Sequence, residues 1–254
     1  MIYFNVKGDM TMDKKKLIFL SGPLALVCYI LHDILGGLNY PGYDPLTQAV
    51  SDLTADSAPS LWISQPLSRA FGVLSILCAG AACVYLAKRV NRLQWSGVIV
   101  FAAMNVISAV GYTLFPLTDA GLPDGFQNVM HIVVTVLVVA ASIVSLVLTG
   151  VGGFLKRGDR ALGAAAWTAF ALMLAGAVGS GAAPKAVFGI FERFSTYSAA
   201  AFTAFLGIRC MPQLVEKVCY AREAGFEIRF LSRLRRGKKH FYPHKCANCR
   251  RSRQ

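Results

Sequence analysis

The chain has 254 residues, of which 55% are hydrophobic and only 15% charged, and its formal net charge is +13. A soluble domain normally carries about a quarter charged residues, so this composition argues against a soluble enzyme or binding domain. The apolar residues occur in long runs and not in the alternating or one-faced patterns of a soluble core, which predicts membrane-spanning helices.

Six apolar runs follow one another along the chain: 17–38, 66–87, 95–115, 128–150, 161–183 and 190–211. Each holds about 20 residues, enough at about 1.5 Å per residue to cross a hydrocarbon layer of about 30 Å. The fifth run is rich in alanine and glycine, which is typical of a helix that its neighbours approach closely. We therefore predict an all-α fold: a polytopic integral membrane bundle of six helices.

Lysine and arginine alternate between the segments that join these runs. The basic segments are the N-terminus, residues 88–94, residues 151–160 and the tail from 213, which alone has twelve. Residues 39–65 and 116–127 have none, and 184–189 has only Lys185. Because cytoplasmic segments carry the excess of Lys and Arg, we expect both ends of the chain to be cytoplasmic. The predicted location is a bacterial inner membrane.

This pattern divides the chain into three parts. Residues 1–16 form a cytoplasmic N-terminus, 17–212 the six-span membrane domain, and 213–254 a basic cytoplasmic tail. We expect the tail to be partly an interfacial helix and partly disordered. Its charges suit the anionic headgroups of membrane lipids better than nucleic acid, which needs more than charge for recognition.

Polar side chains gather at the predicted outer ends of the spans and in the first outer loop, which is the longest connection. We expect them to converge on one outward-facing pocket, because ionisable groups at membrane depth seek partners or water. His32 and Asp33 both approach the outer end of the first run. The candidates for the pocket are His32, Ser51, Asp52, Asp119, His131, Glu192, Arg193 and Tyr197.

Two interpretations of these candidates remain open. Asp52, Asp119 and His131, with His32, could bind a divalent metal and activate water. Alternatively, Glu192 and Arg193 form a structural pair, Asp52 caps a helix, and backbone or water satisfies the histidines. No dense metal-binding spacing such as His-Glu-x-x-His occurs in the membrane region.

The tail contains a second set of metal-ligand types, His240, His244, Cys246 and Cys249. They include a true Cys-x-x-Cys, but the whole set spans ten residues and lacks the long spacer of a zinc finger. Adventitious binding is the simpler interpretation, and a dedicated metal site is the alternative.

Three motifs in order resemble a known family. They are the stretch YPGYDPLTQAVSDL at residues 40–53, Phe115-Pro116 followed by Asp119 and His131, and GIFERFSTY at residues 189–197. Over about residues 15–211 the chain resembles domain of unknown function family 998, a family of six-helix microbial membrane proteins without an established activity. The resemblance implies a six-helix membrane fold and no particular reaction.

A more distant resemblance is to the membrane hydrolases that include alkaline ceramidases, through a Ser-Asp followed by a histidine. Those proteins have paired histidines in their last helices, whereas runs five and six here contain no histidine. The predicted function is therefore binding of a lipid or ion in the outward-facing polar pocket. The alternative is a membrane-embedded, metal-dependent lipid hydrolase. The sequence does not decide whether the protein is an enzyme, and it identifies no cofactor beyond a divalent metal for the hydrolase alternative.

Overall fold

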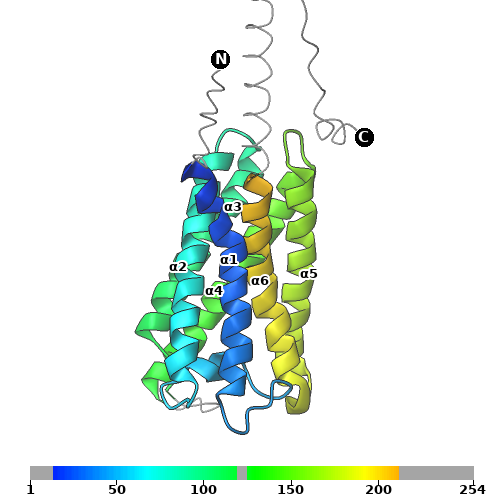
Figure 1. Cartoon of the computed structure of the whole chain (residues 1–254). Coiled ribbons are helices and arrows are strands. Elements are labelled where there is room, and N and C mark those ends of the chain that lie inside the picture. The colour runs from blue at the N-terminus through cyan, green and yellow to red at the C-terminus, as the bar shows by residue number, and fades with distance from the viewer. Residues whose placement is uncertain (1–13, 119–124, 212–254) are drawn as a thin grey trace, which may run out of the picture. The chain divides into compact units, whose positions relative to one another are not determined.

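The computed structural model describes residues 14–118 and 125–211. This part of the chain is helical and contains no strand, so the all-α prediction is confirmed. Six long helices run up and down beside one another (Figure 1). Their bounds are α1 Lys14–Leu38, α2 Leu61–Leu86, α3 Arg92–Leu114, α4 Phe126–Phe154, α5 Arg160–Ala182 and α6 Phe188–Cys210.

Helices that follow one another in the chain lie side by side, and α6 closes the bundle against α1 and α2. Figure 1 shows α1 and α6 adjacent, although they are the first and last helices of the bundle. Short connections force neighbouring helices to be antiparallel, so each end of the bundle collects alternate connectors. The first connector, which we define as residues 39–60, and the connection from α5 to α6 therefore lie at the same end.

The outer surface of the bundle is apolar. Val84 on α2 is 82% exposed and Val136 on α4 is 61% exposed. Helices α1 to α5 are each long and apolar enough to cross a membrane. An apolar surface of this extent requires lipid as its solvent, so the chain is an integral membrane protein.

Helix α6 differs from the other five helices because it falls short of that hydropathy. It packs against α1, α2 and α5, and Phe202 meets Phe101 of α3 edge to face with ring centroids 4.9 Å apart. A side chain at Gly207 would come within 2.5 Å of the carbonyl oxygen of Phe19 on α1. Because α6 packs mostly against protein, its polar residues need not face lipid. The fifth run was predicted to let its neighbours approach closely, and at Gly176 an added Cβ would come within 2.6 Å of the Phe191 carbonyl oxygen on α6. The same helix also exposes Trp167, Leu172 and Val178.

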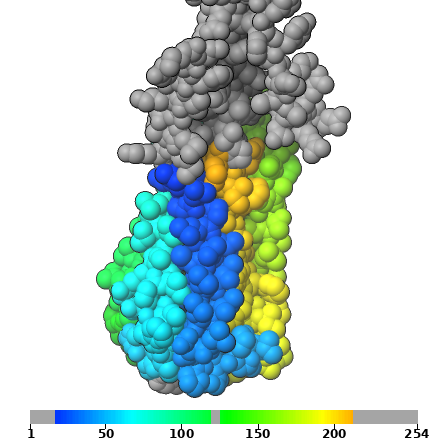
Figure 2. All heavy atoms as spheres, in the orientation of Figure 1, coloured from blue at the N-terminus to red at the C-terminus, as the bar shows by residue number. Residues whose placement is uncertain are grey.

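The first connector is folded back onto the bundle. It contains a short 3₁₀ helix, η1 (Ser51–Thr54), and a second one, η2 (Lys185–Val187), precedes α6. Val50 and Leu53 are buried among Tyr29 of α1 and Ala200 of α6. Figure 2 shows the connector lying against the beginning of α6 at one end of the molecule. Burial of these apolar side chains is one part of what holds the connector in place.

The predictions for residues 1–13 and 213–254 lie outside the described residues. These include the interfacial helix of the tail and the four candidate metal ligands His240, His244, Cys246 and Cys249.

Candidate functional site

Arg193 is the centre of the polar groups at the connector end of the bundle. It lies on α6, and its guanidinium faces Asp33 of α1 in a two-point ion pair. Nε is 3.0 Å from Asp33 Oδ2 and Nη2 is 2.7 Å from Oδ1. The two side chains are only 16% and 12% exposed. A bidentate, shielded pair of this kind is among the stronger charge-assisted interactions in proteins.

The same guanidinium binds the first connector. Nη1 donates to the carbonyl oxygens of Pro45 at 2.7 Å and Gln48 at 3.1 Å, and also to that of Gly189 at 3.1 Å. Nη2 donates to the hydroxyl of Tyr43 at 2.8 Å. Arginine has five N–H donors, and every one of them has a protein acceptor here. The guanidinium therefore ties α1, α6 and the connector together.

Two tyrosines complete this group. The Tyr197 hydroxyl donates to Asp33 Oδ2 at 2.9 Å, and the Tyr43 hydroxyl donates to the carbonyl oxygen of Ala49 at 2.8 Å. Burial raises the pKa of Tyr43 to about 12, so its phenol is neutral at physiological pH. We call Asp33, Tyr43, Arg193 and Tyr197 the Arg193 cluster.

Two acidic side chains bind the backbone of the connector immediately after the residues that Arg193 contacts. Glu192 Oε2 accepts the backbone N–H of Val50 at 3.1 Å, and Asp52 Oδ2 accepts that of Ala49 at 3.2 Å. The two peptide groups are adjacent, so these carboxylates hold one short stretch of backbone. Burial raises the pKa of Asp52, and the Ala49 N–H and the charge of Arg193 partly oppose that shift.

Gly189 allows α6 and the connector to approach this closely. Its N–H donates to the carbonyl oxygen of Leu46 at 2.9 Å. An added Cβ would come within 2.5 Å of the Pro45 carbonyl oxygen and would also collide with that of Gln48. A glycine is therefore needed at the first turn of α6.

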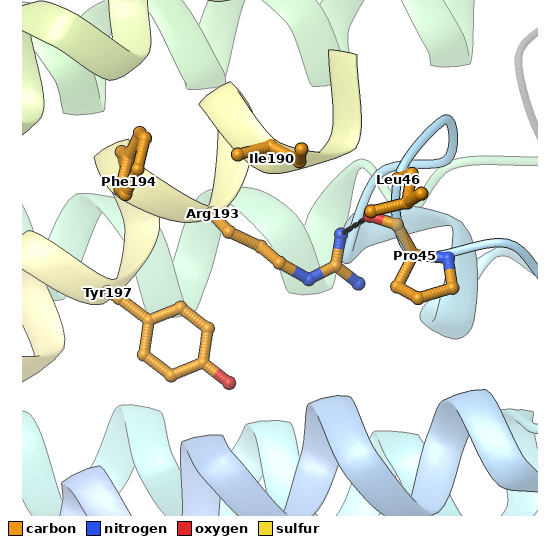
Figure 3. Close-up of a pocket in the computed structure, with 6 residues that line it drawn as sticks. All are labelled: Pro45, Leu46, Ile190, Arg193, Phe194 and Tyr197. Carbon is orange, nitrogen blue, oxygen red and sulfur yellow. Dashed lines mark hydrogen bonds between the residues drawn. The ribbon is translucent and has the colours of Figure 1, made fainter. Parts of the chain in front are cut away.

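A cavity of about 410 Å³ opens beside this contact. We call it the connector pocket; it is lined by Pro45, Leu46, Ile190, Arg193, Phe194 and Tyr197. In Figure 3 Arg193 reaches from α6 to the Pro45 carbonyl, with Ile190 and Phe194 on the α6 side and Leu46 opposite. It is an open hollow on the surface of the bundle and not a cavity enclosed by protein.

The lining of the connector pocket is apolar in character. Arg193 and Tyr197 direct their polar atoms to Asp33 and the connector, and the other four lining residues are hydrocarbon. A pocket suited to an apolar group therefore lies next to the Arg193 cluster.

The structure brings only some of the sequence candidates together. Arg193 and Tyr197 share Asp33, while Glu192 and Asp52 bind neighbouring peptide groups. Glu192 does not pair with Arg193 but with the backbone of Val50. Ser51 begins η1, and its carbonyl oxygen accepts the Thr54 hydroxyl at 3.1 Å.

The two histidines are held separately. His32 is buried with Nδ1 3.1 Å from the carbonyl oxygen of Ser64, whereas His131 on α4 has Nδ1 2.9 Å from that of Phe115. Both contacts are to backbone, as the structural interpretation of the sequence expected. Asp119 lies outside the described residues. Among residues 14–118 and 125–211 no three metal-binding side chains form a group, and the metal-dependent alternative stays a prediction.

Tyr43 of the Arg193 cluster was missing from the sequence candidates, and Asp33 was noted near the outer end of the first run but not as the partner of Arg193. Asp33 lies five residues before the end of α1, and Arg193 lies five residues after the start of α6. At about 1.5 Å per residue, both are roughly 7.5 Å from the helix ends. Opposite charges at equal depth in antiparallel helices are a signal that could have paired them. Tyr43 carries no such signal in the sequence.

Residues 22–209 match the family described as protein of unknown function (DUF998). The chain belongs to the DUF998 family. The match covers α2 to α5 completely and leaves out only the first eight residues of α1 and the last residue of α6, so the Arg193 cluster and the connector pocket lie within the DUF998 region. Comparisons with curated proteins and with solved structures give no match.

Removing either partner of the ion pair should destabilise the protein strongly. Arg193→Ala and Asp33→Ala should each lower the unfolding free energy by roughly 3–5 kcal/mol, because each leaves a shielded charge without its partner. Arg193→Ala should cost more, since it also releases the connector. Thermal and denaturant unfolding in detergent micelles measure both effects.

The double variant separates this pairing from a general loss of packing. Asp33→Ala with Arg193→Ala should cost clearly less than the sum of the single changes. Arg69→Ala is the control, because Arg69 on α2 is exposed and forms no ion pair with the residues that the structure describes. Additive losses, or a loss in Arg69→Ala as large as in Arg193→Ala, would contradict the central role of the pair.

Asp52→Asn should make stability less dependent on pH. A carboxyl group whose pKa is raised by folding costs stability as pH rises above its usual value of 3.8. The variant should therefore be more stable than wild type at neutral pH, and the difference should shrink as pH falls toward that value. Unfolding temperatures across pH measure the difference, with Asp56→Asn in the same connector as the control. A difference independent of pH would show that Asp52 does not behave in this way.

Proposed function

We propose that the protein binds a membrane lipid in the connector pocket, with an acyl chain against Leu46, Ile190 and Phe194. The observation that carries this proposal is the combination of an open pocket of about 410 Å³ and a lining of hydrocarbon. An acyl chain in the bilayer already lies in an apolar medium, so its binding would be driven by van der Waals packing against these side chains and not by transfer from water. In an integral membrane protein the most abundant apolar occupant is the lipid itself.

The polar residues have a supporting part in this proposal. Their hydrogen bonds are made within the protein, and they fix the position of Pro45 and Leu46, which form one wall of the pocket. A rigid wall lowers the ordering cost of binding a flexible chain. The role is non-enzymatic binding, in which the Arg193 cluster shapes the site and no bond of the lipid is broken.

The membrane orientation is part of the same proposal. Six spans with both termini in the cytoplasm of a bacterium would place the connector pocket at the outer leaflet of the inner membrane. The alternation of Lys and Arg along the chain supports this, as does the burial of α6, which accounts for its lower hydropathy. Impermeant thiol reagents should label a single cysteine at residue 57 from outside and one at residue 157 only after permeabilisation. Labelling of both from the same side would contradict the orientation.

Photoreactive lipid should identify the pocket directly. A phospholipid with a diazirine on its acyl chain, mixed at low mole fraction into vesicles holding the protein, should cross-link saturably to residues 46, 190 and 194. Ile190→Trp should reduce this labelling several-fold, because the larger side chain fills the pocket. Mass spectrometry of the cross-linked peptides measures the yield.

Ile208→Trp is the matched control, since Ile208 lies on the same helix, is 51% exposed and does not line the pocket. It should leave labelling at the three pocket positions unchanged. Melting temperatures show that both variants are folded. Equal labelling of wild type and folded Ile190→Trp would remove the proposal.

A further inference from the structure

A lipid in the connector pocket needs a place for its headgroup, and Arg193 does not provide one. All five of its N–H donors already have acceptors in Asp33, the connector and α6. A phosphate could bind Arg193 only by displacing these acceptors. The headgroup must therefore meet side chains outside the Arg193 cluster.

Two charged residues flank the lining residues of the pocket. Asp44 directly precedes Pro45 on the connector side, and Lys185 lies in η2 just before α6. The hydrogen bond from Gly189 N–H to the Leu46 carbonyl oxygen holds these two segments together at 2.9 Å. Asp44 and Lys185 do not line the pocket themselves, but they belong to the two segments that this hydrogen bond joins.

Each of these residues retains binding capacity. Lys185 is exposed, and within residues 14–118 and 125–211 no carboxylate forms an ion pair with it. Asp44 Oδ1 accepts the Leu46 N–H at 3.0 Å and Oδ2 the Thr47 hydroxyl at 3.0 Å. A carboxylate has about four acceptor positions, so about two remain for a ligand.

The charges of these residues indicate the class of headgroup. Lys185 and Asp44 contribute one formal positive and one formal negative charge, and the Asp33–Arg193 pair below them is neutral in sum. Such an arrangement complements a zwitterion, whereas a net anionic headgroup would leave Asp44 facing negative charge. A primary ammonium can donate hydrogen bonds to a carboxylate, but a quaternary one has no N–H to donate.

The depth of these residues agrees with this arrangement. Lys185 lies outside the first turn of α6, whereas Arg193 is roughly 7.5 Å inside it. The polar layer of each leaflet is about 5–7 Å thick. A headgroup at the level of Lys185 and Asp44 would therefore leave its acyl chain beside Ile190 and Phe194.

We propose that the connector pocket selects a phospholipid with a primary-ammonium headgroup, of the phosphatidylethanolamine class. Lys185 binds its phosphate, and Asp44 binds its ammonium. This selection rests on the lipid binding proposed above and adds the identity of the headgroup.

Competition between headgroups tests the selection. Cross-linking by the diazirine lipid is measured while unlabelled phosphatidylethanolamine, phosphatidylcholine or phosphatidylglycerol with identical chains is added. Phosphatidylethanolamine should compete at least several-fold better than the other two. Asp44→Asn should abolish its advantage over phosphatidylcholine, because the amide keeps an acceptor for the Leu46 N–H but loses the charge. Lys185→Gln should weaken competition by all three lipids, and Lys185→Arg should restore it.

The outcomes separate the two proposals. Saturable cross-linking with equal competition by the three lipids, or with phosphatidylglycerol as the best competitor, overturns the headgroup selection and leaves lipid binding intact. An advantage of phosphatidylethanolamine that persists in Asp44→Asn also overturns it. Absence of saturable cross-linking to residues 46, 190 and 194 overturns the proposed function itself.

Discussion

The contact between Arg193 and Asp33 is the interaction on which the connector end of the protein depends. A lone charge at membrane depth is costly, by roughly 2.5–3.5 kcal/mol on insertion scales. Here the guanidinium and carboxylate meet at two points, and every remaining donor of Arg193 has an acceptor. The pair is satisfied only while α1, α6 and the first connector are all in place. Its geometry therefore couples three segments that are far apart in the sequence.

That coupling explains why a connector of this length is ordered. Backbone carbonyls of Pro45 and Gln48 face Arg193, and the N–H of Val50 faces Glu192. Buried backbone groups need such partners, because an unpaired one costs about 1–3 kcal/mol. Val50 and Leu53 add apolar burial beneath them. The connector pocket is a consequence of this arrangement, since its two walls are the connector and the first turns of α6.

Helix α6 shows how far hydropathy alone can predict this fold. The run 190–211 agrees within two residues with α6, although the helix itself is not apolar enough to be recognised as a span by composition. The charged residues that lower its hydropathy all have protein partners: Glu192 binds the connector, Arg193 pairs with Asp33 of α1, and Arg209 pairs with Asp159. The predicted second run begins at residue 66, whereas α2 begins at Leu61 and contains Pro66. Proline in the interior of a helix usually breaks or kinks it in soluble proteins, but transmembrane helices tolerate it.

The candidate site was harder to predict than the fold for a physical reason. Periodicity and hydropathy report which faces are apolar, and they gave six helix positions from local sequence. The partner of a charge depends on how deep it lies in the bundle and on which helices are neighbours. One of the two interpretations of the sequence therefore paired Arg193 with the adjacent Glu192, and neither paired it with Asp33. Tyr43 acts through hydrogen bonds of its hydroxyl group, and Gly189 through the close approach of two backbone segments. No local sequence pattern reveals either role. The sequence predicted a polar pocket, whereas the structure satisfies the polar groups internally and leaves a hydrocarbon wall.

Hydrogen exchange of the connector tests most directly whether Arg193 holds this end of the protein together. In lipid nanodiscs, the backbone amides of residues 43–50, except Pro45, should exchange slowly in wild type, close to the rate of the helices. In Arg193→Lys, which keeps the charge but loses the planar set of donors, they should exchange at least tenfold faster while α3 and α4 stay protected. Fast exchange of residues 43–50 in wild type, or unchanged slow exchange in the variant, would contradict the account.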